Sequence, residues 1–132
     1  MASDRTVVRE GPFAQFIPEG VKVGNLITLS GQVSIDEQGE VVAPGDLVAQ
    51  AKQAYTHVAS SLEKLGAGMG DIVDEMFLVT DVGNAMANIE ELWKVRAEAY
   101  GVDQPDVSQT MVQVAGLVMP ELMIEIKIIA SV

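Results

Sequence analysis

The sequence contains no cysteine and only one histidine, His57. The absence of cysteine excludes disulfides, thiolate zinc sites and thiol nucleophiles, and it fits a reducing compartment. His57 has no second histidine with which to bind a metal, and no histidine base is available to Ser30, so Ser30–Gly31 does not indicate a serine-hydrolase triad. We interpret His57, in the middle of an expected helix, as a structural or solvated side chain.

Basic and aromatic residues are also scarce. Eight lysines and arginines stand against nineteen acidic residues, giving a formal net charge of −11, and aromatic residues make up 5% of the chain. Nucleic-acid binding needs cations for the phosphates and aromatic rings for the bases, so we expect no nucleic-acid partner. No apolar run approaches the roughly 18–20 residues of a membrane span, and residues 1–6 do not resemble a secretory signal. We therefore expect a soluble, cytoplasmic protein with no membrane partner.

The acidic residues do not form a metal-binding pattern. The pairs Asp36–Glu37, Asp74–Glu75 and Glu90–Glu91 lack the order of a calcium loop, and we expect them to be solvated. Gly66–Gly70 is rich in glycine but follows an expected helix and precedes a strand, the reverse of a phosphate loop at a helix N-terminus. We interpret it as a helix C-cap followed by a turn, and we expect no metal site.

Residues 1–132 fit one domain by length, and the spacing of apolar residues predicts its elements. A helix is predicted from Leu47 to Leu65, capped by Asp46 and ended by Gly66. A second helix follows Asp81–Asn84 and ends before Gly101, with one face formed near Met86, Ile89, Trp93, Arg96 and Tyr100. Strands are predicted at 6–10, in two stretches of 21–32 around the Gly24–Asn25 turn, and at 74–80, 110–117 and 122–130.

This order of strands, helix, strand, helix and strands predicts an α+β fold, a mixed sheet with two helices packed on one face. Residues 122–130 alternate so that both faces of the last strand carry apolar side chains. The second face is either partly exposed or covered by another subunit. We favour a second subunit, because a large exposed apolar face is unusual in a monomer.

Glu125 is the residue of this last strand with the clearest chemical potential. Its neighbours Ile124 and Ile126 suggest a partly buried position. Burial favours the neutral form of a carboxyl group, which can then act as a general acid or base near neutral pH. The alternative is an exposed glutamate paired with Lys127 or a neighbouring strand.

Four ordered segments resemble the RidA family, also called YjgF, over about residues 11–130. They are Gly11–Phe13, Val23–Gln32, Val112–Leu117 and Ile124–Ile126. Each motif alone is weak, but the ordered set is specific. The resemblance implies a chorismate-mutase-like α+β fold and a homotrimer with clefts between adjacent subunits. It also implies hydrolysis of enamines and imines such as 2-aminoacrylate, with water as nucleophile and no metal or organic cofactor.

Carried over by position, the resemblance gives Glu125 the catalytic role, in which it orients a water or transfers protons through it. It places six further residues around a small-molecule ligand, with Gly31 offering backbone groups and two of the others forming walls. The six are Phe13, Ser30, Gly31, Asn88, Gln109 and Met111.

Two departures from the family pattern bear on the reaction. Phe13 stands where deaminating members usually have tyrosine, so a hydroxyl group is missing. The family's carboxylate-binding arginine aligns with Gln109, or with Val107 when counted from Pro105, and neither can form the charge-assisted fork of an arginine. Arg96 is an alternative cation, although its spacing favours packing of its stem beside the core.

Three functions remain open at this point. The first is an imine or enamine deaminase of altered specificity, suited to a substrate without a carboxylate. The second is a small-molecule-binding or regulatory trimer that has lost the reaction. The third, the ribonuclease activity attached to some family names, is disfavoured by the net charge of −11.

Overall fold

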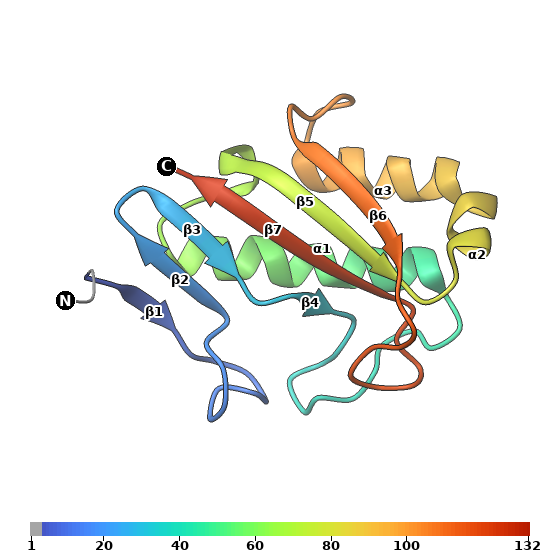
Figure 1. Ribbon diagram of the computed structural model, residues 1–132, viewed down its shortest axis with the longest axis horizontal. Coiled ribbons are helices and arrows are strands. Elements are labelled where there is room, and N and C mark those ends of the chain that lie inside the picture. Colours follow the sequence, from blue (N-terminus) through green and yellow to red (C-terminus); the bar gives the residue numbers. More distant parts are fainter. Residues whose placement is uncertain (1–3) are drawn as a thin grey trace.

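The computed structural model describes residues 4–132, which form a curved sheet with helices behind it (Figure 1). The strands are β1 (Thr6–Val8), β2 (Gly20–Val23), β3 (Leu26–Leu29), β4 (Gln32–Val33), β5 (Ile72–Val79), β6 (Ser108–Gln113) and β7 (Ile124–Ser131). The helices are α1 (Leu47–Lys64), α2 (Val82–Ala87) and α3 (Ile89–Tyr100), with a 3-10 turn, η1 (Met69–Asp71), before β5. The predicted order of strands and helices is confirmed.

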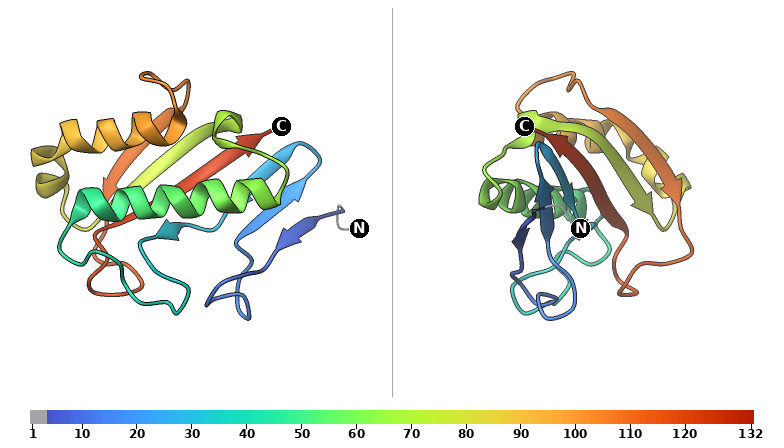
Figure 2. Two further views of the ribbon diagram at one scale, coloured as in Figure 1. Left: turned by 180° about the vertical axis from the view of Figure 1, so that it is seen from behind. Right: turned by 60° about the vertical axis from the view of Figure 1, so that its left-hand side comes forward.

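The sheet has the strand order β1-β2-β3-β7-β5-β6, and β4 also pairs with β7. The pair β5–β6 is parallel and is connected by α2 and α3, whereas the other pairs are antiparallel. Both views in Figure 2 place α1 and α3 on the same face of the sheet. The predicted mixed sheet with helices on one face is therefore correct.

The core lies between these helices and the sheet. On β7 the residues Ile124, Ile126 and Ile128 are buried against the helices, as the alternation predicted. Glu125, Lys127 and Ile129 point to the other side, which we call the open face, and are half-buried. Since β7 is central in the sheet, its register fixes which side chains reach either face.

The first helix begins and ends where its capping residues predicted. The Asp46 side chain accepts a hydrogen bond from the Ala49 N–H at 3.0 Å. Gly66 adopts φ of 76°, a left-handed conformation that glycine tolerates better than other residues. The glycine-rich stretch after it forms the predicted cap and turn rather than a phosphate loop.

The second predicted helix is divided into α2 and α3 at Asn88. Its backbone leaves the helical region at ψ of 20°, and its Nδ2 donates to the Asn84 carbonyl at 2.9 Å. Asparagine side chains compete in this way with the helical hydrogen bonds of the backbone. The fully buried residue of α3 is Leu92, while Trp93 remains 41% exposed and Met86 of α2 55%.

The strand predicted at 110–117 ends earlier, at Gln113. Its neighbour β5 ends at Val79, whose carbonyl accepts the Val114 N–H at 2.9 Å. Beyond that bond β6 has no strand to pair with. Among residues 4–132, none of the helices is long and apolar enough to cross a lipid bilayer.

Candidate functional site

Glu125 lies on the open face of β7, opposite Val33 of β4 and Leu78 of β5. Its carboxylate covers the α-carbon of Gly31, so closely that a Cβ added to Gly31 would lie 2.1 Å from the Glu125 Oε2. Burial raises the pKa of the Glu125 carboxyl group above its usual range, and the nearby Lys127 ammonium partly offsets this. The structure thus holds a partly desolvated carboxylate against a bare stretch of backbone.

Ser30 ties the end of β3 to the segment before β2. Its Oγ donates to the Pro18 carbonyl at 2.7 Å, and its N–H donates to the Glu19 carbonyl at 2.9 Å. The hydroxyl is therefore engaged by the backbone. Its visible role is to fix the position of Gly31.

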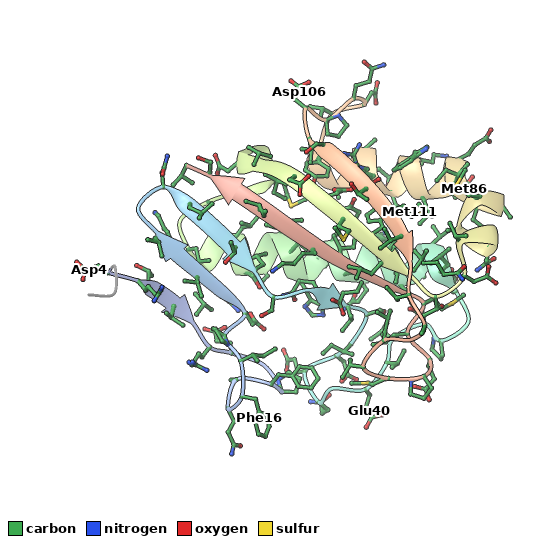
Figure 3. All side chains as sticks on the ribbon, in the orientation of Figure 1. Asp4, Phe16, Glu40, Met86, Asp106 and Met111 are labelled. Carbon is green, nitrogen blue, oxygen red and sulfur yellow. The ribbon has the colours of Figure 1, made fainter. Side chains whose placement is uncertain are left out.

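Phe13 lies in the segment between β1 and β2 and is half-buried. It packs against a small apolar cluster of Val33, Ile35 and Leu122 at one end of the sheet. Figure 3 shows the neighbouring Phe16 pointing away from the body of the molecule, while Met111 lies across the sheet on β6. Phe13, Ser30, Gly31 and Glu125 form one group near the β3–β4 junction.

Asn88, Gln109 and Met111 form a second group at the opposite edge of the sheet. Asn88 joins α2 to α3, and Gln109 and Met111 lie on the edge strand β6, opposite Glu75 and Phe77. The Gln109 Nε2 is buried and has no hydrogen-bond partner among residues 4–132. A buried donor without a partner costs roughly 1–3 kcal/mol, so this amide is destabilising in the isolated chain.

The two groups cannot line one cleft within a single chain. Paired strands point matched residues to the same face, so Gln109 and Met111 face the helices with Glu75 and Phe77, which are fully buried. Glu125 points to the open face, and β5 lies between β7 and β6. Val107, the alternative position for the arginine, offers its carbonyl to Arg96 at 3.1 Å.

Glu75 corrects the prediction that the pair Asp74–Glu75 is solvated. Its side chain is fully buried and accepts hydrogen bonds from Tyr55 Oη at 2.8 Å, Tyr100 Oη at 2.6 Å and Arg96 Nε at 2.8 Å. Burial, together with the Glu75 carboxylate, raises the pKa of both tyrosines above their usual range. Because the Arg96 guanidinium is already bound to Glu75 and to the Val107 carbonyl, Arg96 is not a free cation for a ligand.

The burial of Glu75 could have been predicted from the alternation of side chains along β5. Glu75, Phe77 and Val79 alternate along β5 and share the face that the helices cover. A glutamate in that series must be paired, and Tyr55, Arg96 and Tyr100 come from the predicted inner faces of the two helices. The prediction that Glu75 is solvated was wrong because it considered only the charge of the Asp74–Glu75 pair.

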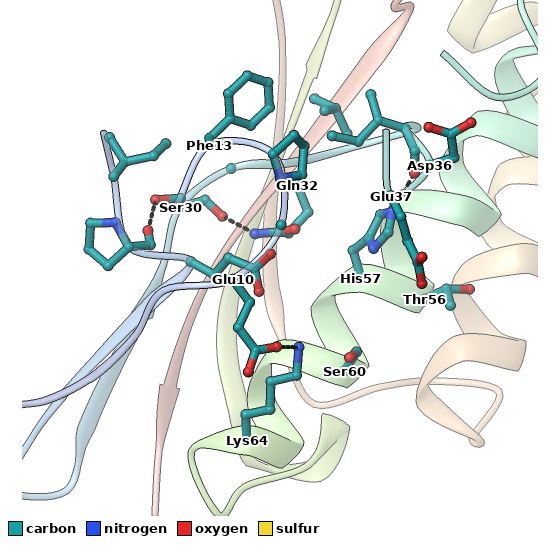
Figure 4. A pocket seen from close by; sticks show the side chains of 18 residues that line it. Glu10, Phe13, Ser30, Gln32, Asp36, Glu37, Thr56, His57, Ser60 and Lys64 are labelled. Carbon is teal, nitrogen blue, oxygen red and sulfur yellow. Dashed lines mark hydrogen bonds and ion pairs between the residues drawn. The ribbon is translucent and has the colours of Figure 1, made fainter. Parts of the chain in front are cut away.

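A cavity of about 550 Å³ lies on the helix side of the β3–β4 junction. Phe13, Ser30 and Gly31 line it, and Glu125 is not among its lining residues. Figure 4 shows Phe13, Ser30 and Gln32 on one side and His57, Ser60 and Lys64 of α1 on the other. His57 contacts the Ile35 carbonyl through Nε2 at 2.7 Å, a structural contact of the kind predicted.

Comparison with known proteins identifies the family. The family model described as Endoribonuclease L-PSP matches residues 8–132. The 2-iminobutanoate/2-iminopropanoate deaminase of Escherichia coli is 32% identical over 131 residues, covering 98% of this chain and 94% of that protein. The chain belongs to the YjgF/RidA family. The resemblance predicted from its four ordered segments is confirmed.

Further members agree in sequence and in fold. A RutC family protein of Pyrococcus abyssi is 33% identical over 91% of this chain and 86% of its own length. The crystal structure of the Escherichia coli YjgF gene product matches with a TM-score of 0.77 and 31% identity over 95% of each chain. A YjgF/YER057c/UK114 family member from Mycobacterium tuberculosis matches with a TM-score of 0.79 and 28% identity, covering 98% of this chain and 100% of that one. The expected fold class is correct.

Proposed function

We propose that this YjgF/RidA protein hydrolyses reactive imines or enamines to a carbonyl product and ammonia, with a specificity different from that of its 2-imino acid deaminase relatives. The observation that carries the proposal is the partly buried Glu125 carboxyl group, which lies over Gly31 with a raised pKa. The 32% sequence identity of this chain to a 2-iminobutanoate/2-iminopropanoate deaminase supports the reaction class. We place the protein in the cytoplasm as one domain, residues 1–132.

The proposed site lies between copies of the chain in a homotrimer. One copy supplies Phe13, Ser30, Gly31 and Glu125, and its neighbour supplies Asn88, Gln109 and Met111. The arrangement in one chain supports this division, because the two groups lie on different faces and edges of the sheet. The Gln109 Nε2 is buried without a partner within residues 4–132, so the amide must turn outward to reach a ligand in this cleft.

The chemistry needs water, proton transfers and no cofactor. An enamine first takes a proton on carbon and loses one from nitrogen to become the imine. Water then adds its oxygen to the imine carbon and one of its protons to the nitrogen, which gives a carbinolamine. The hydroxyl proton then passes to the nitrogen as the C–N bond breaks, and the products are the carbonyl compound and ammonia. Glu125 orients the water and exchanges these protons, a role suited to a carboxyl group whose raised pKa lets both forms coexist nearer neutrality.

Gln109 sets the proposed specificity. A glutamine donates neutral hydrogen bonds, whereas an arginine forms a charge-assisted fork with a carboxylate. Met111 of the same strand and Phe13 add apolar walls without a hydroxyl group. The preferred substrate is therefore an imine without a carboxylate next to the reacting carbon.

A second candidate is a trimer that binds a small molecule without converting it. This candidate is supported by Gln109, which stands where a cation is expected. A neutral glutamine binds the carboxylate of a 2-imino acid more weakly than an arginine does. Ribonuclease activity, the meaning of the matched family description, is opposed by the net charge of −11.

The test is to add the purified protein to a reaction that generates 2-aminoacrylate and to follow the release of pyruvate. We expect a slow acceleration that Glu125→Gln abolishes and that the control Glu98→Gln, on the exposed side of α3, leaves unchanged. We expect Gln109→Arg to increase the rate, because it restores a cation for the substrate carboxylate.

Simple aliphatic imines without a carboxylate form the second arm of this test. Faster hydrolysis of these by the unmodified protein supports the altered specificity. Absence of acceleration with both substrate classes, and with Gln109→Arg, would leave the binding trimer as the function.

A further inference from the structure

The cavity on the helix side of the β3–β4 junction goes beyond the proposed reaction. Its volume of about 550 Å³ lies within the range of small-molecule sites, roughly 300–1,000 Å³. Gly31 separates it from Glu125, whose carboxylate lies against the α-carbon of Gly31 and does not line the cavity. A ligand here would share Phe13, Ser30 and Gly31 with the proposed reaction site, but it would lie on the side of Gly31 away from Glu125.

Gln32 presents a hydrogen-bond acceptor to this cavity. The side chain is only 8% exposed, lines the cavity, and donates from Nε2 to the Ser30 carbonyl at 2.9 Å. Because a carbonyl can only accept, the amide nitrogen must face Ser30 and the amide oxygen must face away from it. That oxygen accepts no hydrogen bond within residues 4–132. The oxygen is accessible from the cavity, so a ligand that donates a hydrogen bond can reach it.

His57 of α1 lies on the opposite wall of the cavity. Its Nε2 contacts the Ile35 carbonyl at 2.7 Å, so Nε2 carries the hydrogen and donates it. In the neutral imidazole, Nδ1 is then an acceptor. An N–H donor on the ligand therefore suits the Gln32 oxygen, and His57 lines the opposite wall.

The charges around the cavity point to a cation. Four carboxylates line it, and the one lysine, Lys64, forms an ion pair with Glu10. Figure 4 shows Glu10 beside Lys64 at one end and Asp36 and Glu37 at the other, near His57. The fourth carboxylate, Glu19, accepts a hydrogen bond from the Ser61 Oγ at 3.1 Å.

Apolar side chains form the wall between the two acidic ends. They come from the segment before β2 and from the strand end after Gly31, and they are Pro12, Phe13, Ile17, Val33 and Ile35. An aliphatic chain fits such a wall, and positive groups at both of its ends fit the carboxylates. Among residues 4–132, no group of three or more acidic or histidine side chains converges to hold a metal ion.

We propose that this cavity binds a linear aliphatic diamine, with one ammonium near Glu10 and Glu19 and the other near Asp36, Glu37 and the Gln32 oxygen. The binding does not use Glu125 and does not depend on imine hydrolysis. Lys64 competes with the first ammonium for Glu10.

The test is calorimetric titration of the full-length protein with diaminobutane. We expect saturable binding at one site per chain, about tenfold or more tighter than that of butylamine, which has one ammonium, and no binding of butanediol, which has none. Equal affinities for the three compounds would overturn the proposal, as would the absence of saturable binding of diaminobutane.

Matched variants distinguish binding in this cavity from general electrostatic attraction of diaminobutane to an acidic protein. Glu37→Gln should weaken diaminobutane binding by about tenfold, whereas Glu98→Gln, which removes the same charge from α3 outside the cavity, should leave it unchanged. Lys64→Gln should strengthen binding, because it removes the competing ammonium. Equal weakening in Glu37→Gln and Glu98→Gln, or weaker binding in Lys64→Gln, would contradict the proposal. Glu125→Gln should bind diaminobutane normally, which keeps this result independent of the proposed reaction.

Discussion

Glu125 carries its carboxylate on the open face, over Gly31 and beside Lys127. Its partly buried position was predictable, because the flanking Ile124 and Ile126 mark a central strand. Its contact with Gly31 was not, because the two residues are brought together only by the pairing of β4 with β7. Local sequence thus indicates the environment of a side chain better than its partner.

The raised pKa of Glu125 predicts a stability that depends on pH. The folded state binds this proton more tightly than the unfolded state, so the contribution is present below the unfolded pKa and is lost as pH rises through the folded pKa. Glu125→Gln, which keeps the neutral shape, should therefore gain stability relative to the unmodified protein as pH rises from about 4, the ordinary pKa of a glutamate, toward neutrality.

The measurement is urea unfolding of both proteins across that range at one fixed protein concentration, because association also shifts stability. Glu98→Gln serves as the exposed control and should show no comparable trend. A difference between Glu125→Gln and the unmodified protein that is constant with pH would contradict the assignment.

Gly31 allows a second prediction at the residue scale. An alanine there would place its Cβ 2.1 Å from the Glu125 Oε2, so the carboxylate must move. Gly31→Ala should turn the flexible carboxylate away at a cost of about 0.5–1.5 kcal/mol and should abolish the pH-dependent difference caused by Glu125. Gly116→Ala, whose Cβ meets no atom within 4 Å, is the control. Unchanged stability and unchanged pH dependence in Gly31→Ala would show that the carboxylate does not lie where described.

At the scale of elements, the long helix α1 was predictable because its signals agree. Asp46, the apolar spacing and Gly66 all indicate the same boundaries. The division of the second helix at Asn88 was not predicted, because a single asparagine is compatible with a continuous helix. The strand β6 ends early because its neighbour β5 ends there. Residues 110–117 carry no information about the end of β5, so this boundary could not be predicted from them.

The Glu75 network joins β5 to α1 and α3, and it predicts a large effect on stability. Glu75→Leu leaves the Arg96 guanidinium and two tyrosine hydroxyls without their acceptor. Removing one partner of a buried ion pair costs about 3–5 kcal/mol. Denaturant unfolding should show this loss for Glu75→Leu, and a smaller loss for Tyr100→Phe, about 1.5–3 kcal/mol for one hydrogen bond to a charged group.

A double variant provides the control for this network. Glu75→Leu combined with Arg96→Met should be less destabilised than the sum of the two single variants, because neither charge is left unpaired. Simple additivity would mean that the two side chains do not interact in solution.

At the scale of the whole molecule, the two faces of the sheet differ in cover. The helices bury one face, while the open face exposes apolar side chains, including Val7, Leu26 and Val112 around Glu125 and Lys127. The sequence predicted apolar groups on both faces of β7, and the structure agrees. It could not place Phe13 and Gln109 at opposite edges of the sheet, because that depends on the order in which the strands pair.

In the proposed homotrimer, Glu125 of one copy and Gln109 of another face the same cleft. Because the chain contains no cysteine, a variant with Glu125→Cys and Gln109→Cys carries its only two thiols at these positions. A short bismaleimide cross-linker followed by denaturing electrophoresis measures whether the two thiols are joined within or between chains. We expect covalent dimers and trimers from the double variant, and only monomers from either single variant. Cross-linked species that remain monomeric, or the absence of any cross-link, would contradict this shared cleft.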